Sequence, residues 1–254
     1  MIGKKTRHSL AQFLELHETA FVAILMNKYD IRTSIEDGSL LSDVLQSLLS
    51  ANNENVLSLL FEIARTSGDL RARVNPKYRH DERFSDLSRC LLLDGYIVQN
   101  KSVIPTDPSI SDAPPLEDDL LEALKVSGLP GSDEIVKKIN DSSESFRLLP
   151  PNYNACLNDI RVALETLARS IATTRHLDGA PPYDPNKWGS VINFLKQTEF
   201  ITQEEDRGLA GVYGFVSPGS HKPLGISEEQ MARLGRSLAL GMCWFLIKSY
   251  QSAA

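Results

Sequence analysis

Apolar residues recur at spacings of three and four along the first third of the chain, which is the pattern of amphipathic helices. This spacing predicts a first helix over residues 8–27, with Ser9 as its N-cap. Two further helices are expected over residues 39–50 and 54–66, where leucine, valine and isoleucine again follow a helical period. The N-terminal third is therefore expected to be a small helical unit.

The hydrophobic pattern changes in the next segment. A helix is expected over residues 83–93, and it stops at an Asp-Gly pair. β-Rich residues then occupy positions 96–98 and 102–104, and residues 99–101 can supply a tight turn between them. A helix followed by glycine and a strand-turn-strand hairpin is the layout of a winged helix, so a winged-helix-like hairpin is expected over residues 96–104.

Basic residues gather around this segment. Between Arg65 and Arg89 the chain has seven lysines and arginines against four acidic residues. The candidate contacts with nucleic-acid phosphates are Arg83 and Arg89 on the helix and Lys101 in the turn. The alternative is a packing module with a solvated basic face, because winged helices also serve as protein–protein modules.

Proline separates the two halves of the chain. Residues 105–119 contain four prolines, and the stretch 109–115 is expected to be the linker. Beyond it the helical period resumes. The expected helices cover residues 116–126, 132–143, 152–176, 188–197 and 202–217, and Ser227 caps a final helix. Because short loops join them, these helices are expected to form an up-and-down bundle.

For two of these helices the sequence predicts further details. Thr202 and Glu205 have the spacing of a capping box. The final helix is expected to bury a stripe made of Met231, Leu234, Leu238, Met242, Phe245 and Leu246. Arg233 and Arg236 lie off that stripe, so both are expected to be solvated or at a dimer face.

Composition narrows the class of protein. With 254 residues, 42% hydrophobic and 24% charged, the chain is expected to be an ordinary globular protein. Its net charge of −6 excludes a broadly basic nucleic-acid coat but is compatible with a local basic patch. The three cysteines lack CxxC spacing and are expected to be buried free thiols. Charged residues interrupt the first apolar run, so we expect no signal peptide, no membrane span and a cytoplasmic location.

Sequence motifs for the large enzyme classes do not occur in the chain. There is no phosphate-binding loop, Rossmann glycine pattern, serine-hydrolase elbow or set of cysteines and histidines with metal-ligand spacing. We therefore expect no cofactor and no metal.

Two stretches resemble a known family. The segment NACLNDIRVALETLARSIA is followed by a short helix, an acidic helix and a loop with one histidine before a long apolar helix. This arrangement resembles the HEPN-type four-helix domains of bacterial abortive-infection and toxin–antitoxin proteins. The preceding LSRCLLLDGYIVQNKSVIP is similar to the small winged-helix-like segments found ahead of such domains in phage-defence proteins. The resemblance covers roughly residues 80–254.

This resemblance implies a site near the start of the final helix. Active family members are metal-independent ribonucleases, with an arginine separated by four to six residues from a histidine. His221 matches that histidine, and an imidazole can act as general acid or base. Positions 214–216, where the arginine would stand, hold none. Arg161 and Glu165 are either a surface ion pair or a polar pair facing a groove beside this loop, and Ser217 is a further candidate binding residue.

Together these observations predict a mainly α protein. Residues 1–108 are expected to form the helical unit with its hairpin, and residues 116–254 a HEPN-like bundle. The favoured function is an interaction module of phage defence that binds RNA, DNA or a protein partner. The alternatives are a divergent metal-independent ribonuclease with His221 as general acid or base, and a purely structural scaffold subunit. The resemblance also implies a homodimer or a subunit of a defence complex, with no membrane partner.

Overall fold

The structure is a computed structural model, and it describes residues 2–32, 39–105, 116–217 and 227–253. These residues form twelve α-helices and one two-stranded sheet, so the protein is mainly α, as expected. The chain divides into two compact units, Met1–Pro115 and Leu116–Ala254. The expected linker at residues 109–115 lies outside the described ranges.

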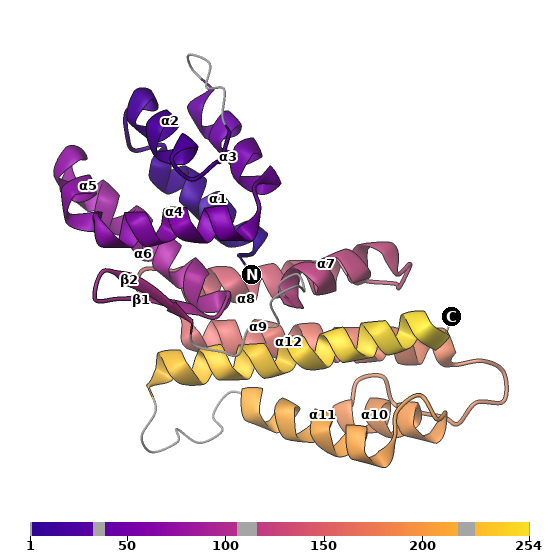
Figure 1. Ribbon diagram of the computed structural model, residues 1–254. Coiled ribbons are helices and arrows are strands. Elements are labelled where there is room, and N and C mark those ends of the chain that lie inside the picture. The colour runs from indigo at the N-terminus through magenta and orange to yellow at the C-terminus, as the bar shows by residue number, and fades with distance from the viewer. Residues whose placement is uncertain (1, 33–38, 106–115, 218–226, 254) are drawn as a thin grey trace. The chain divides into compact units, whose positions relative to one another are not determined.

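The first unit is built from helices and one hairpin (Figure 1). Its described elements are α1 (Lys4–Leu14), α2 (Thr19–Asn27), α3 (Leu40–Ser50), α4 (Asn53–Arg65), α5 (Ser67–Arg73), α6 (Lys77–Leu93), β1 (Tyr96–Gln99) and β2 (Ser102–Pro105). Helix α1 packs against α3 and α6, and β1 packs against the end of α6. The core between them consists of buried leucine, isoleucine, valine and phenylalanine side chains.

The hairpin follows from the residues of its turn. Strands β1 and β2 are antiparallel, with Gln99 opposite Ser102. The two residues between them, Asn100 and Lys101, have φ angles of 51° and 59°. Positive φ at both central positions is the signature of a type I′ turn, and asparagine tolerates this conformation better than most residues. The expected strand-turn-strand hairpin is confirmed, and its winged-helix character stays a prediction.

The expected single helix over residues 8–27 is wrong, because α1 and α2 are separate helices with a turn between them. His17 lies in this turn, and its ring packs against Phe13 and Phe21, with centroid separations of 5.5 and 5.7 Å. Its backbone N–H donates to the carbonyl of Leu14 at the end of α1. The chain therefore turns at His17, whose imidazole is buried between α1 and α2, and does not continue as the one straight helix that the periodicity predicted.

The start of α1 was also predicted wrongly. Ser9 is not the N-cap; it lies inside α1, is buried, and its hydroxyl donates to Asp86. Asp94 lies at the start of the helix instead, where its Oδ2 accepts from the Gly3 N–H at 2.7 Å and from the Thr6 hydroxyl at 2.6 Å. Asp94, which follows α6, thus accepts hydrogen bonds at the N-terminus of α1, where no neighbouring side chain caps the helix.

Helix α6 begins at Lys77, six residues before the expected start at Arg83. Pro76 directly precedes it, and a proline suits a helix start because its missing N–H would have no partner there. The first turns of α6 are polar and exposed except for His80, which is buried. Because these turns have a single buried position, they show no hydrophobic periodicity from which a helix could be predicted.

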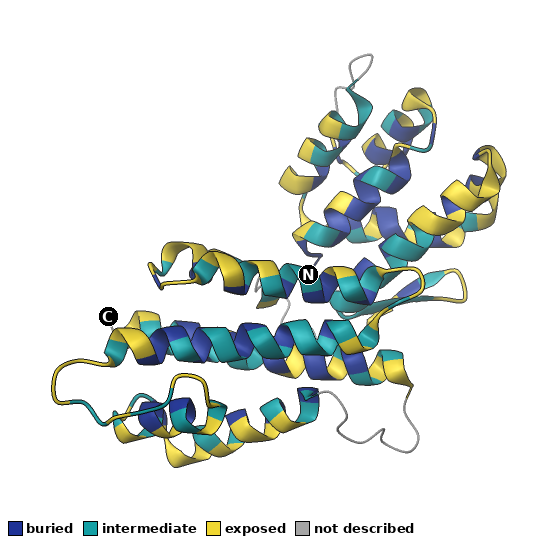
Figure 2. Cartoon of the chain, turned by 180° about the vertical axis from the view of Figure 1, so that it is seen from behind, coloured by how far each residue is buried: buried dark blue, intermediate teal, exposed yellow. Residues whose placement is uncertain are grey.

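The second unit is a helical bundle. Its described helices are α7 (Leu116–Val126), α8 (Ser132–Arg147), α9 (Tyr153–Arg175), α10 (Trp188–Gln197), α11 (Gln203–Val216) and α12 (Glu228–Ala253). Helix α9 packs against α8 and α12, and α10 and α11 pack against α9. Buried and exposed positions alternate along the helices in Figure 2. The predicted capping box is confirmed, because Thr202 and Glu205 bond each other's backbone N–H groups.

The buried face of α12 differs from the predicted stripe. Leu234 and Leu238 are 46% and 39% exposed. The buried positions of α12 are Ala232, Gly235, Arg236, Ala239, Leu240, Cys243, Leu246 and Ile247. A Cβ at Gly235 would lie 2.7 Å from Leu157 Cδ2 and 3.3 Å from Phe215 Cε1. Small residues therefore allow α12 to approach α9 and α11 closely, while Leu234 and Leu238 face outward.

Arg236 is also not solvated, contrary to the prediction, since it is 3% exposed. Its Nη2 donates to Glu117 Oε2 at 2.8 Å, and its Nε donates to Ser142 Oγ at 3.2 Å. The Ser142 hydroxyl in turn donates to the carbonyl oxygen of Cys156 at 2.8 Å. This network joins α12 to α7, α8 and α9. Its ion pair and hydrogen bonds offset the free-energy cost of burying the guanidinium.

The three cysteines are buried and free, as predicted. Burial raises the pKa of the Cys243 thiol to about 12, so this thiol stays protonated and unreactive. Across the described ranges, no helix combines the length and the apolar character that crossing a bilayer requires.

Candidate functional site

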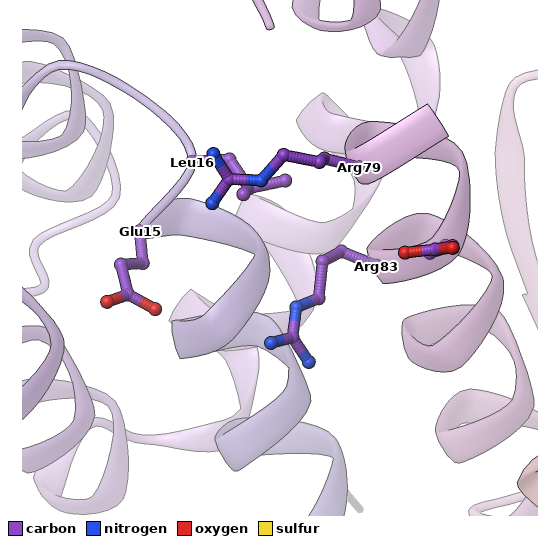
Figure 3. Close-up of a pocket in the computed structure, with 5 residues that line it drawn as sticks. Glu15, Leu16, Arg79 and Arg83 are labelled. Carbon is purple, nitrogen blue, oxygen red and sulfur yellow. The ribbon is translucent and has the colours of Figure 1, made fainter. Parts of the chain in front are cut away.

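A cavity of about 320 Å³ opens in the first unit, where the end of α1 meets the first turns of α6. The residues that line it are Glu15, Leu16, Arg79, Glu82 and Arg83. Arg79 and Arg83 extend from α6 toward the end of α1, where Glu15 and Leu16 lie (Figure 3). The cavity is therefore lined mainly by charged side chains, from α6 and from the turn that directly follows α1.

The two arginines reach this cavity because of their spacing on α6. They are four residues apart, so they lie on one face of the helix, one turn from each other. The neighbouring face of α6 packs against α1 through His80 and Phe84, whose rings lie 5.3 and 5.9 Å from the ring of Phe13. This aromatic contact fixes the helix behind the cavity.

Other basic residues of this segment already have structural roles. Arg71 donates two hydrogen bonds to the carboxylate of Asp81, at 2.7 and 2.8 Å, and this bonding lowers the pKa of Asp81 to about 2. The ammonium of Lys77 donates to two carbonyls at the end of α5. The guanidinium of Arg73 lies over the ring of Phe21, 4.7 Å from its centroid. These three cations stabilise the fold locally.

Arg79 and Arg83 are engaged differently. Nη1 of Arg83 donates to the neutral amide oxygen of Gln12 at 3.0 Å. Among the described residues neither guanidinium forms an ion pair, although Glu15 and Glu82 line the same cavity. Two adjacent guanidiniums offer several N–H donors in a fixed geometry that suits phosphate or carboxylate oxygens. The site is thus able to bind an anion.

The other predicted contacts of this unit lie elsewhere on it. Arg89 is six positions after Arg83, which places it roughly 120° around the axis of α6, on another face. Lys101 is exposed in the turn of the hairpin. The structure thus groups Arg83 with Arg79, which was not among the predicted contacts. The four-residue spacing of these two arginines was the signal that could have found it.

The predicted polar pair of the bundle belongs to a larger cluster. Arg161 forms an ion pair with Glu165 and donates to Asn158 Oδ1 at 3.0 Å. The Tyr213 hydroxyl donates to Glu165 Oε1 at 2.7 Å and accepts from Arg161 Nη1 at 3.3 Å. Trp188 stacks on Tyr213, with centroids 4.5 Å apart and planes inclined by 10°. Burial, together with the bond to Glu165, raises the pKa of Tyr213.

This cluster fastens α9, α10 and α11 to one another. Ser217 extends it, because its hydroxyl donates to the carbonyl oxygen of Tyr213 at 2.7 Å. The guanidinium of Arg161 bonds three neighbours and so ties α9 to α11, and a binding role for the Arg161–Glu165 pair and Ser217 stays a prediction. His221, the predicted general acid or base, lies outside the described residues.

The described residues contain no group of three or more histidine, cysteine, aspartate or glutamate side chains that could hold a metal ion. No family model, no curated protein and no solved structure matches the chain. The HEPN-like and phage-defence assignments therefore stay predictions, and the candidate site is assessed from its own geometry.

Proposed function

We propose that this chain is an interaction module that contacts nucleic-acid phosphates through Arg79 and Arg83, as part of a HEPN-like phage-defence protein. The observation that supports this function is the pair of guanidiniums that face one cavity without an ion pair among the described residues. Phosphate oxygens are the natural acceptors for such a pair. Because the chain has a net charge of −6, this contact is local rather than spread over the surface.

The hairpin supplies a second contact in this proposal. Lys101 is exposed at its turn, which is the position of the wing in a winged helix. A lysine there suits a phosphate as a flexible point charge. The module thus has a primary contact at the cavity and an accessory one in the turn.

The second unit is assigned to partner binding, either a second copy of the chain or another defence protein. Leu234 and Leu238, which face outward on α12, support this role because exposed leucines lose unfavourable hydration when a partner covers them. This part of the proposal also draws on the HEPN-like resemblance.

Charge reversal tests the nucleic-acid contact. In fluorescence anisotropy with a labelled single-stranded RNA or DNA at about 0.1 M salt, Arg79→Glu with Arg83→Glu is expected to weaken binding at least about tenfold. Lys125→Glu with Lys187→Glu is the matched control, since both lysines are exposed and lie in the other unit. Equal losses in both double variants, or no binding by the unaltered protein, would refute the proposal.

The proposal also predicts that His221 is not a catalytic residue. RNA incubated with the protein without metal is expected to stay intact, and His221→Ala is expected to bind nucleic acid as the unaltered protein does. RNA cleavage that disappears in His221→Ala would instead establish the ribonuclease alternative.

A further inference from the structure

The charges of the α6 cavity suit a particular kind of phosphate. An internal phosphate of a nucleic-acid strand is a diester and carries one negative charge, whereas a terminal phosphate monoester carries about −1.5 to −2 at pH 7. Arg79 and Arg83 place two positive charges on one face of α6, at the same cavity. A terminal phosphate therefore matches the charge of the pair better than the backbone does.

The carboxylates of the cavity add a second requirement. Glu15 and Glu82 line it together with the arginines, and a bare anion would be repelled by them. A nucleotide avoids this repulsion when its ribose hydroxyls or exocyclic amino groups donate to the carboxylates. The volume of about 320 Å³ is at the lower end of small-molecule pockets, which suits one nucleotide.

The wall behind the cavity is held in place by an aromatic cluster. Leu16 and Arg79, which line the cavity, directly precede His17 and His80 in the chain. These two imidazoles are 7% and 3% exposed and both pack edge-on against Phe13. The backbone of α6 and of the turn after α1 is thus held in place behind the cavity before a ligand arrives, which lowers the entropy lost on binding.

We infer that this cavity binds a terminal phosphate monoester of a nucleotide, with Arg79 and Arg83 on the phosphate and Glu15 accepting from the nucleoside. The inference rests on the proposed function, since it names the ligand of the same site. Two sources share this chemistry: a free nucleoside monophosphate and the phosphorylated end of a strand.

Matched oligonucleotides test this inference. Anisotropy is measured with one short labelled sequence that carries a 5′-phosphate, a 3′-phosphate or hydroxyls at both ends, as RNA and as DNA. A strand with a terminal phosphate is expected to bind at least tenfold more tightly than the hydroxyl form. Arg79→Ala with Arg83→Ala is expected to abolish this preference, whereas Arg65→Ala, an exposed arginine on α4, is expected to keep it.

Competition with free nucleoside monophosphates then separates the two sources. If free monophosphates displace the phosphorylated strand, the site binds small nucleotides. If they do not displace it and the preference for a terminal phosphate remains, the site binds strand ends. Equal binding of phosphorylated and hydroxyl strands that is lost in the arginine variant would overturn this inference and leave the proposed function standing. The absence of binding to any strand or nucleotide would overturn both.

Discussion

Arg7 and Arg236 show what a buried cation requires in this protein. Arg7 is 7% exposed and donates to the carbonyls of Ile2 and Ala51 and to Asn53 Oδ1, and Arg236 pairs with Glu117. Each guanidinium is buried only where several acceptors surround it. Among the described residues Arg83 has a single acceptor, Gln12 Oε1, and both Arg79 and Arg83 stay exposed, so they are available to a ligand.

His17 is buried without such compensation. Among the described residues neither of its ring nitrogens has a hydrogen-bond partner. Burial, and secondarily the nearby His80, lowers the pKa of His17 to about 4. The folded protein therefore keeps this imidazole neutral, whereas the unfolded chain takes up a proton below its ordinary pKa of 6.5.

This difference predicts acid sensitivity of the first unit. Between pH 6.5 and about 4 the unfolded state binds more protons, so the free energy of unfolding falls as the pH falls through this window. In His17→Phe, which cannot titrate, the fall is expected to be smaller. Denaturant titrations at several pH values measure it, and identical pH dependence of the two proteins would contradict the assignment.

At the scale of elements, the bundle depends on the close approach of α12 to α9 and α11. Gly235 lies at this approach, whereas a Cβ added at Gly241 on the same helix would meet no side chain or neighbouring helix within 4 Å. Substitutions at these two glycines therefore provide a matched test of how closely α12 packs.

Gly235→Val is expected to destabilise the bundle by about 1–3 kcal/mol, because its side chain would overlap Leu157. Gly241→Val is expected to be neutral or slightly stabilising, since glycine weakens a helix interior. Thermal unfolding followed by circular dichroism compares them. Similar melting temperatures for both variants would show that the helices are not packed as closely as described.

The ion pair between Arg236 and Glu117 ties α7 to α12. Arg236→Ala is expected to cost about 3 kcal/mol of unfolding free energy, because it removes the cation that pairs with the largely buried carboxylate of Glu117. Arg236→Met with Glu117→Leu is expected to recover much of that loss, since neither charge is then buried. A double variant less stable than the single one would argue against the pairing.

At the scale of the whole molecule, the sequence correctly predicted the features that depend on residues close together in the chain. The capping box at Thr202, the turn at Asn100 and most helices of the bundle depend on neighbours in the chain and were correct. The cap from Asp94 and the burial of Arg236 depend on partners far along the chain, so periodicity could not reveal them.

The candidate site was predicted only in part, for the same reason. Arg83 was selected from local charge, but its grouping with Glu15 depends on how α1 meets α6. The cluster of Arg161 and Glu165 was predicted as a pair, and Tyr213 joins it only through the packing of α11 on α9. His221 lies outside the described residues, and ribonuclease chemistry there stays the alternative to the proposed function.

The salt dependence of binding tests the central claim most directly. Affinity for a single-stranded oligonucleotide is measured from about 50 to about 200 mM salt, for the unaltered protein and for Arg79→Ala with Arg83→Ala. If the two guanidiniums each contact a phosphate charge, the slope of log affinity against log salt becomes shallower by about 1.4 in the variant. An unchanged slope would mean that these arginines do not contact nucleic acid.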